Sequence, residues 1–378
     1  MRRTSRTLVA SVLALLAIGI VMLASTSSVR ASATFEDPYY FLKRQLVWLA
    51  ISLGAGALLI RFDYHWLQRL AWLIGAAAVV LLALVLVPRV GTRIAGSSRW
   101  LRAGPMSVQP SEFAKIAVVV VLSAWMSRLG LRSGRLLEGL LIPLVGLGVI
   151  LVLVLLEPDY GTTLLVGVVG MLILFAGGAR LGHLIVAGAS GVCAFILAVL
   201  QDPVRMGRVL AFLMPEKYPE AAYHLSQSKV AFIRGEWFGV GLGNSIQKQF
   251  YLPEAHTDFI LAIIGEELGL LVTLVVVGLF VAILVCGMII TFSAPDPFGR
   301  LLAFGMTVLL TLQAAINVGV VTGCLPTKGL ALPFISYGGS SLVASVAAIS
   351  ILLNVAGHCA APEEDDHTRL IKDRAHRL

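Results

Sequence analysis

The chain has 378 residues, of which 58% are apolar and only 13% are charged, and its mean hydropathy is +0.90. A soluble globular domain has about a quarter charged residues, and a disordered chain has far fewer apolar ones. This composition excludes both classes and predicts that most of the polypeptide lies in lipid. The 37 glycines and 15 prolines are compatible with membrane helices, where close helix contacts and kinks are tolerated.

The net charge of +8 includes 29 lysines and arginines that are scattered between the apolar runs, without a basic block interleaved with aromatic residues. We therefore expect membrane lipid with anionic headgroups as a partner, and no nucleic acid. The four cysteines form no CxxC pair, so neither a metal site nor a disulfide framework is predicted.

Apolar runs long enough to cross a bilayer recur along the whole chain. A hydrocarbon core about 30 Å thick requires roughly 20 apolar residues per helix. We count ten such runs: 7–27, 45–61, 68–88, 111–128, 137–156, 161–179, 182–200, 259–292, 301–322 and 334–357. They predict an all-α integral membrane protein, a polytopic bundle of about ten transmembrane helices over residues 7–358, with a long extracytoplasmic loop at 201–258 between helices 7 and 8.

The first run has a second interpretation. Three arginines in residues 1–6 precede it and Ala31-Ser32-Ala33 follows it, which is also the pattern of a cleavable signal peptide. Its apolar core is longer than that of a typical signal sequence, so we expect this span to be retained. Cleavage would leave nine spans.

The short loops predict the orientation of the chain, because cytoplasmic loops of membrane proteins are rich in Lys and Arg. Once the long 201–258 segment is set aside, the basic residues place both termini in the cytoplasm, namely residues 1–6 and a short disordered tail at 359–378. The short outer loop 89–111 is an exception. It keeps four cations against this rule, which indicates a function for them: Arg89, Arg93, Arg99 and Arg102.

Polar motifs gather at the ends of the runs that face outside, and charges are nearly absent from the middles of the runs. Transporters place ionisable groups near the membrane midplane, whereas an enzyme acting on a membrane-anchored substrate can work at one surface. The asymmetry therefore favours an enzyme. The outer polar segments are Arg99-Trp100, Gln109 to Lys115, Glu157-Pro158-Asp159, Ser226 to Glu267, Pro326-Thr327-Lys328 and Ser336 to Ser341.

Asp258 lies at the start of the eighth run, after a segment, 239–243, with three alternating glycines. The glycines alone are compatible with a flexible loop. Glu254 is four residues before Asp258, so the two carboxylates share one face beside His256 if the helix begins early. Asp258 is then either a helix cap or a general base at the membrane surface.

Two lysines are candidate anion contacts. Lys115 lies about one turn inside the fourth run, where a lone cation snorkels to the surface, pairs with a carboxylate such as Glu112, or meets an anionic ligand. Lys328 lies in a short outer loop, where it is either simply solvated or part of the same site. Together with Arg99, these cations favour a diphosphate site.

Taken together, the motifs resemble the SEDS family of bacterial polytopic glycosyltransferases, whose members include FtsW, RodA and SpoVE. The resemblance covers nearly the whole hydrophobic region, and the stretch Gly241 to Lys248 is most similar to the FtsW and SpoVE branch. One departure is Ile233, where the family usually has glycine. The motifs are Arg99-Trp100, Gln109 to Lys115, Glu157 to Thr162, Gly241 to Lys248, Leu252 to Ile260, Gly265-Glu266-Glu267, Pro326 to Gly329 and Pro333 to Ser341.

This resemblance implies a peptidoglycan glycosyltransferase of the bacterial cytoplasmic (inner) membrane. It would polymerise lipid II, the undecaprenyl-diphosphate-linked disaccharide peptide, into glycan strands on the outer side, in septal cell-wall synthesis during cell division. The implied partners are a class B penicillin-binding transpeptidase and other division proteins. The resemblance also names Asp258 as the essential aspartate of the family.

The expected reaction is an inverting attack of an acceptor hydroxyl on the anomeric carbon of the donor, with Asp258 as the catalytic base. Because a diphosphate leaves as a stabilised anion, Lys and Arg side chains or a divalent cation can replace a second carboxylic acid. No other cofactor is indicated. Arg99, Lys115 and Lys328 are expected to contact the diphosphate, and the other expected substrate-binding residues are Glu112, Glu254, His256 and Ser340.

Two alternatives remain open at this point. A flippase that translocates lipid II would use the same substrate and the same membrane architecture. A membrane scaffold for the division machinery would depend on helix faces rather than on the outer motifs. Polymerisation of lipid II by the purified protein would separate the enzyme from both.

Overall fold

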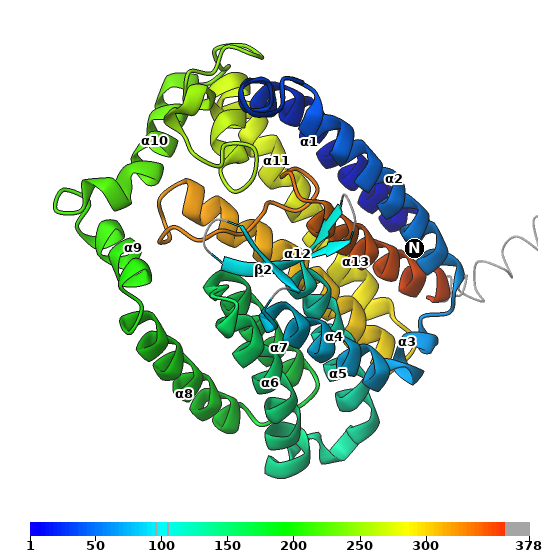
Figure 1. The fold of residues 1–378 in the computed structure, drawn as a ribbon. Coiled ribbons are helices and arrows are strands. Elements are labelled where there is room, and N and C mark those ends of the chain that lie inside the picture. Colours follow the sequence, from blue (N-terminus) through cyan, green and yellow to red (C-terminus); the bar gives the residue numbers. More distant parts are fainter. Residues whose placement is uncertain (89, 95–96, 104–105, 360–378) are drawn as a thin grey trace, which may run out of the picture.

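The apolar runs fold into helices that pack into a bundle (Figure 1). The computed structural model describes residues 1–88, 90–94, 97–103 and 106–359. Within these ranges, eight helices are long and apolar enough to cross a membrane, and two shorter apolar helices accompany them. The long ones are α1 (Arg2–Phe35), α2 (Tyr40–Arg61), α5 (Pro110–Leu129), α6 (Ile142–Leu156) with the preceding π-helical turn η2 (Leu137–Leu141), α8 (Leu181–Leu200), α11 (Ile260–Ser293), α12 (Pro297–Val321) and α13 (Gly339–His358), and the shorter ones are α4 (Ala71–Leu86) and α7 (Tyr160–Ala176).

Each predicted apolar run overlaps one of these helices, so the prediction of an all-α, multi-pass membrane protein is confirmed. The number of helices that cross the bilayer stays a prediction, as do the domain bounds. The predicted tail from residue 360 onward and Arg89 lie outside the described residues.

Two connecting segments have structure of their own. The predicted 201–258 loop contains α9 (Pro203–Leu213), α10 (Pro219–Gly235) and the π-helical turn η3 (Gln247–Tyr251). The segment after α4 forms a three-stranded antiparallel sheet, which the sequence analysis did not predict. Its strands are β1 (Gly91–Ile94), β2 (Ser97–Ala103) and β3 (Met106–Val108), with Thr92 opposite Trp100 and Leu101 opposite Val108. The short helices α3 (His65–Arg69) and η1 (Gly130–Gly134) complete the described elements.

Aspartates fix where two helices near the outer motifs begin. Asp159 precedes α7 and accepts a hydrogen bond from the backbone N–H of Thr162 at 3.2 Å. Asp202 precedes α9 and accepts from the N–H groups of Val204 and Arg205, and proline follows it at the first helical position. Both arrangements satisfy N–H groups that a helix start leaves unpaired.

Helices α5, α12 and α13 form the centre of the bundle and are buried along most of their length, whereas α8 lies at its edge, joined to α7 and α9 (Figure 1). Small residues permit the closest helix contacts. A Cβ atom on Gly287 of α11 would lie 2.1 Å from Thr307 Oγ1 of α12, so only glycine allows this approach.

Helix α11 is interrupted at Gly269, whose φ of 80° and ψ of 179° are not helical. The loop after α10 fills the gap. Val240 and Gly241 donate their N–H groups to the carbonyls of Glu266 and Glu267, and Leu270 donates to the carbonyl of Glu236, at 2.9 to 3.0 Å. The glycine-rich segment 239–243 is therefore a bonded part of the bundle rather than a flexible loop.

Two fully buried carboxylates, Glu266 and Glu267, lie just before the interruption, and each is paired with a cation. Glu267 binds Lys248 of η3 at 2.8 Å and accepts hydrogen bonds from Ser25 of α1. Glu266 contacts Arg234 of α10 at 3.2 Å and accepts from Ser245. Buried charges are tolerated when they are paired and hydrogen-bonded in this way. The network ties α1, α10 and η3 to the first part of α11.

Candidate active site

Asp258 lies in a tight turn, 254–259, directly before α11. The backbone N–H groups of Thr257 and Phe259 donate to the carbonyl of Glu254 at 3.1 and 3.3 Å, and Glu254 itself has the left-handed φ of 58°. Helix α11 begins only at Ile260, and its N-cap, Phe259, makes no side-chain cap. The condition under which Glu254 and Asp258 would share one helical face, an early start of the helix, is therefore not met. Asp258 does not cap α11 either.

The carbonyls of this turn are held one after another by neighbouring elements. Ser336 Oγ donates to the carbonyl of Thr257 at 2.6 Å, and the N–H of Tyr337 donates to that of His256 at 3.0 Å. Asn317 of α12 donates to the carbonyl of Asp258 at 2.8 Å. A backbone fixed at successive positions keeps a reactive side chain in one geometry.

The side chain of Asp258 is half-buried and lies against the backbone of the 322–338 loop. A Cβ atom added to Gly329 would be 2.8 Å from Asp258 Oδ2. Burial, followed by the negative charges of Glu254 and Asp159, raises the pKa of Asp258 to about 7, although Arg99 and Arg208 oppose this shift. A carboxylate whose pKa lies near neutral pH is suited to accept a proton in catalysis.

Three arginines from two separate elements form a cluster, and the charges of two of them, Arg99 and Arg208, act on Asp258. Arg99 of β2 donates through Nε to the carbonyl of Glu157 at 2.9 Å and through Nη2 to that of Pro158. Arg205 of α9 also donates to the Pro158 carbonyl, at 3.1 Å. Arg208 is one turn further along α9, and its pKa is lowered by burial and then by the positive charges of Arg205 and Arg99. Clustered, partly buried guanidinium groups form a favourable site for an anion.

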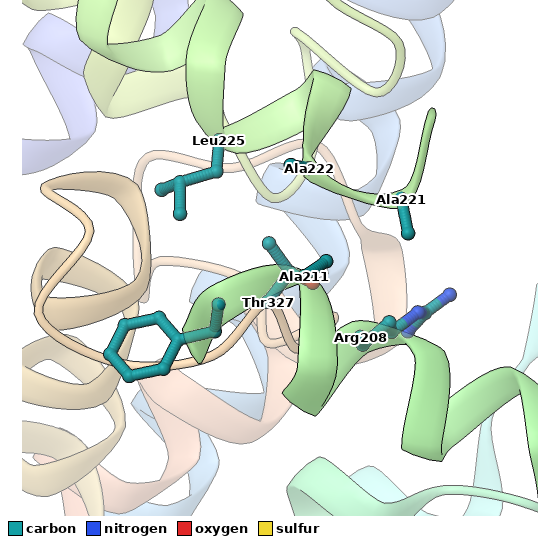
Figure 2. Close-up of a pocket in the computed structure, with 7 residues that line it drawn as sticks. Arg208, Ala211, Ala221, Ala222, Leu225 and Thr327 are labelled. Carbon is teal, nitrogen blue, oxygen red and sulfur yellow. The ribbon is translucent and has the colours of Figure 1, made fainter. Parts of the chain in front are cut away.

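Arg208 also lines a small pocket beside Thr327 of the 322–338 loop, together with residues of α9 and α10 (Figure 2). Arg205 and Arg208 were not among the predicted site residues, because residues 201–258 were expected to form a loop. The signal that could have found them is the Asp202-Pro203 helix start, which places arginines three residues apart on one face of the following helix.

Of the predicted diphosphate contacts, Lys328 lies near the arginines, because the residue before it, Thr327, lines the same pocket as Arg208. It is half-buried in the 322–338 loop, one residue before Gly329, and its Nζ lies 5.3 Å from the ring centre of Phe195 on α8. Burial lowers the pKa of Lys328. Its charge has no carboxylate partner among the described ion pairs, so it is available to an anionic ligand.

Lys115 has a different setting from the one expected. Its Nζ lies 2.8 Å from Glu112 Oε2 and donates to Gln313 Oε1 at 2.8 Å, and both charged side chains are buried. Gln313 in turn donates to the carbonyl of Ala331, two residues after Gly329. The snorkelling alternative is excluded, since Lys115 is 3% exposed. The pair of Lys115 and Glu112 thus supports the 322–338 loop from inside the bundle.

The remaining predicted substrate-binding residues have contacts within the protein, and their role in binding stays a prediction. His256 is buried, with its ring 5.0 Å from that of Phe41. Glu254 is exposed and accepts from Thr257 Oγ1 at 3.0 Å. Ser340, at the start of α13, accepts from the N–H of Gln109 at 2.9 Å. Among the described residues, no group of three His, Cys, Asp or Glu side chains is placed to hold a metal ion. The use of a divalent cation stays a prediction.

Comparison with known proteins places these residues in a family. The family model described as "Cell cycle protein", which covers FtsW, RodA and SpoVE, matches residues 6–360. The chain is 44% identical over 353 residues to a probable peptidoglycan glycosyltransferase FtsW of Trichlorobacter lovleyi, which covers 93% of each chain. A protein of the same description from Legionella pneumophila is 40% identical and covers 92% of this chain and 89% of that protein.

Solved structures agree with the sequence relatives. A chain from a peptidoglycan synthase complex that coordinates polymerization and crosslinking matches with a TM-score of 0.75 and 30% identity, over 92% of this chain and 96% of that chain. The crystal structure of the rod shape determining protein RodA of Thermus thermophilus matches with a TM-score of 0.70 and 27% identity, over 94% and 97% of the two chains. The expected resemblance is thereby confirmed, and the chain belongs to the FtsW/RodA/SpoVE family of membrane proteins.

Proposed function

We propose that this protein is a peptidoglycan glycosyltransferase that joins lipid II units into glycan strands in septal cell-wall synthesis. The observation that carries the proposal is a half-buried carboxylate, Asp258, with a pKa near neutrality, beside Arg99 and Arg208. Relatives over most of the chain carry the name peptidoglycan glycosyltransferase, which supports the same reaction.

In this reaction, a sugar hydroxyl of the acceptor attacks the anomeric carbon of the donor. A C–O bond forms to the acceptor oxygen while the C–O bond to the diphosphate breaks, with inversion at carbon. The hydroxyl proton passes to the carboxylate of Asp258, and the bonding electron pair leaves with the lipid diphosphate. Asp258 can take this proton because it is ionised in a substantial fraction of molecules at neutral pH.

The arginines and Lys328 meet the negative charge that develops on the departing diphosphate. Arg99 uses two of its N–H groups on the Glu157-Pro158 carbonyls, which fixes its position and leaves its remaining donors for the ligand. Donors that are held in place before the reaction stabilise developing charge without reorganisation. Lys115 and Glu112 act indirectly, by holding the 322–338 loop against Asp258.

The arrangement of the two chain ends supports the proposed orientation of the protein. The N-terminus lies beside the end of α13 (Figure 1), so both ends of the described chain are on one side of the bundle. The arginine-rich N-terminal residues favour the cytoplasm for this side, which supports a location of Asp258 at the outer surface of the cytoplasmic membrane. A class B penicillin-binding transpeptidase is the proposed partner, since a similar chain belongs to a complex that polymerises and crosslinks. Other division proteins complete the expected assembly.

The test is polymerisation of labelled lipid II by the purified Asp258→Asn variant with its transpeptidase partner. We expect the rate to fall about 10² to 10⁴-fold, as for a lost general base. The matched control is Asp63→Asn, an exposed aspartate at the other end of the bundle, which should retain the parental rate. Glycan strands made at near parental rate by Asp258→Asn would exclude the proposed base. Headgroup translocation without strand formation by the parent protein would indicate a flippase instead.

A further inference from the structure

A buried carboxylic acid lies directly behind the arginine cluster. Glu157 follows the last residue of α6 and is 0% exposed, and neither of its carboxylate oxygens has a hydrogen-bond partner in the described part of the chain. An ionised carboxylate in such a place would be strongly unfavourable, because it loses its hydration and gains no hydrogen bond in return. Glu157 is therefore held as the neutral acid.

The charged groups around Glu157 come from three elements. Arg99 of β2 is anchored on the Glu157 and Pro158 carbonyls, Arg205 of α9 is anchored on the Pro158 carbonyl, and Asp159 follows in the same turn. Burial is the largest effect on the pKa of Glu157, and the negative charge of Asp159 adds to it. Although Arg99 acts in the opposite direction, the pKa is raised to about 8.

Ionisation of Glu157 would change the neighbouring guanidinium most. While Glu157 is neutral, the charge of Arg99 is directed to Asp258 and to any anion bound beside it. Once Glu157 loses its proton, it can recover part of the cost of burial by pairing with Arg99 of β2, which is bonded to its backbone carbonyl and whose positive charge acts on it. The two uses of Arg99 compete.

We propose that Glu157 is a positioning residue that acts through Arg99: the neutral acid leaves the guanidinium free for the lipid diphosphate, and the ionised form withdraws it. This inference rests on the proposed function, because it needs an anionic donor at Arg99. It predicts that donor binding weakens as the pH rises through about 8. The loss of activity expected at acid pH is a separate effect, because it comes from protonation of Asp258.

The experiment measures kcat and KM for lipid II polymerisation between pH 6 and 10, in the parent and in Glu157→Gln. In the parent we expect KM to rise roughly tenfold on the alkaline side, the scale of one lost hydrogen bond to a charged group. Glu157→Gln, which cannot ionise, should keep the acid limb and lose this rise. A KM that still rises in Glu157→Gln, or a folded variant without activity, would overturn the proposal.

A second cation could also titrate on the alkaline side, since the pKa of Lys328 is lowered by burial. Lys328→Arg separates the two, because the alkaline rise in KM should persist when position 328 stays charged. Its loss in Lys328→Arg would assign the rise to Lys328 and refute the role of Glu157. The matched control, Glu138→Gln, removes a carboxylate of η2 that pairs with Arg135, and its profile should equal that of the parent.

Arg99→Gln keeps the proposal testable if Glu157→Gln does not fold. Without the cation, KM should be high at pH 7.5 and should not rise further above pH 8. A continued rise would show that Glu157 does not act through Arg99. Failure of the proposed function gives a different result, namely an Asp258→Asn variant that still polymerises lipid II at the parental rate.

Discussion

Asn317 offers the sharpest test of how the catalytic turn is held. Its side-chain amide donates to the carbonyls of Asp258 and Leu330 at 2.8 and 2.7 Å, and the residue is 2% exposed. In Asn317→Ala, both carbonyls lose their donor in a buried setting. Each such loss costs about 1 to 2 kcal/mol, so we expect the free energy of unfolding to fall by about 2 to 4 kcal/mol.

A matched control exists at the opposite end of the bundle. Asn354 of α13 is 3% exposed and donates to the carbonyls of Leu59 and Ile60 at 2.7 and 3.3 Å, and to the carbonyl of Phe62. Asn354→Ala should therefore lose a similar amount of stability without disturbing Asp258. The two variants separate a general loss of stability from a specific loss of geometry.

The assay is the polymerisation rate per folded molecule in lipid nanodiscs, with thermal unfolding measured on the same samples. Because a shift of about 1 Å in a catalytic group can cost about 10²-fold in rate, we expect Asn317→Ala to lose roughly 10 to 100-fold in kcat. Asn354→Ala should retain the parental kcat. Equal kcat values for the two folded variants would refute the view that Asn317 positions Asp258.

Three further predictions concern the same region. Because the pKa of Asp258 is about 7, the protonated form dominates below that value, and kcat/KM should fall about tenfold per pH unit below pH 7; a flat acid profile would contradict this. Gly329→Ala places a Cβ atom 2.8 Å from Asp258 Oδ2 and should reduce polymerisation, whereas Gly146→Ala, with open space around it, should not. Lys248→Met leaves the buried charge of Glu267 unpaired and should lower the unfolding free energy by about 3 to 5 kcal/mol, measured by denaturation; an unchanged midpoint would argue against the pair.

The helices were predictable because the bilayer requires an apolar run of a certain length, and such runs can be read directly from the residues. The apolar run also predicted that Asp258 lies just before a long helix, which spans residues 260–293. The run did not predict the exact residue at which this helix begins. A difference of a few residues there decides whether the carboxylate caps a helix or lies free of it. That depends on the bonds from Ser336, Tyr337 and Asn317, which come from distant parts of the chain.

The cation cluster could be predicted only in part. Arg99 was marked by its unusual place in an outer loop. Arg205 and Arg208 lie on α9, an amphipathic helix of 11 residues that is too short to stand out as a membrane span. The contact of Arg205 with the Pro158 carbonyl depends on how α9 folds back. Lys115 shows the reverse case. Its sequence context is compatible with a ligand contact. Only the packed structure shows that its ammonium group contacts Glu112 and Gln313, which take up two of its three donors.

The non-helical Gly269 divides α11 into two rods joined end to end. The first rod, 260–268, follows the Asp258 turn and is fastened to α1 and α10, while the second, 270–293, continues toward the far side of the bundle. Leu270 and Leu271, at the start of the second rod, donate their N–H groups to the carbonyls of Glu236 and Trp237, so the loop after α10 braces the joint between the two rods.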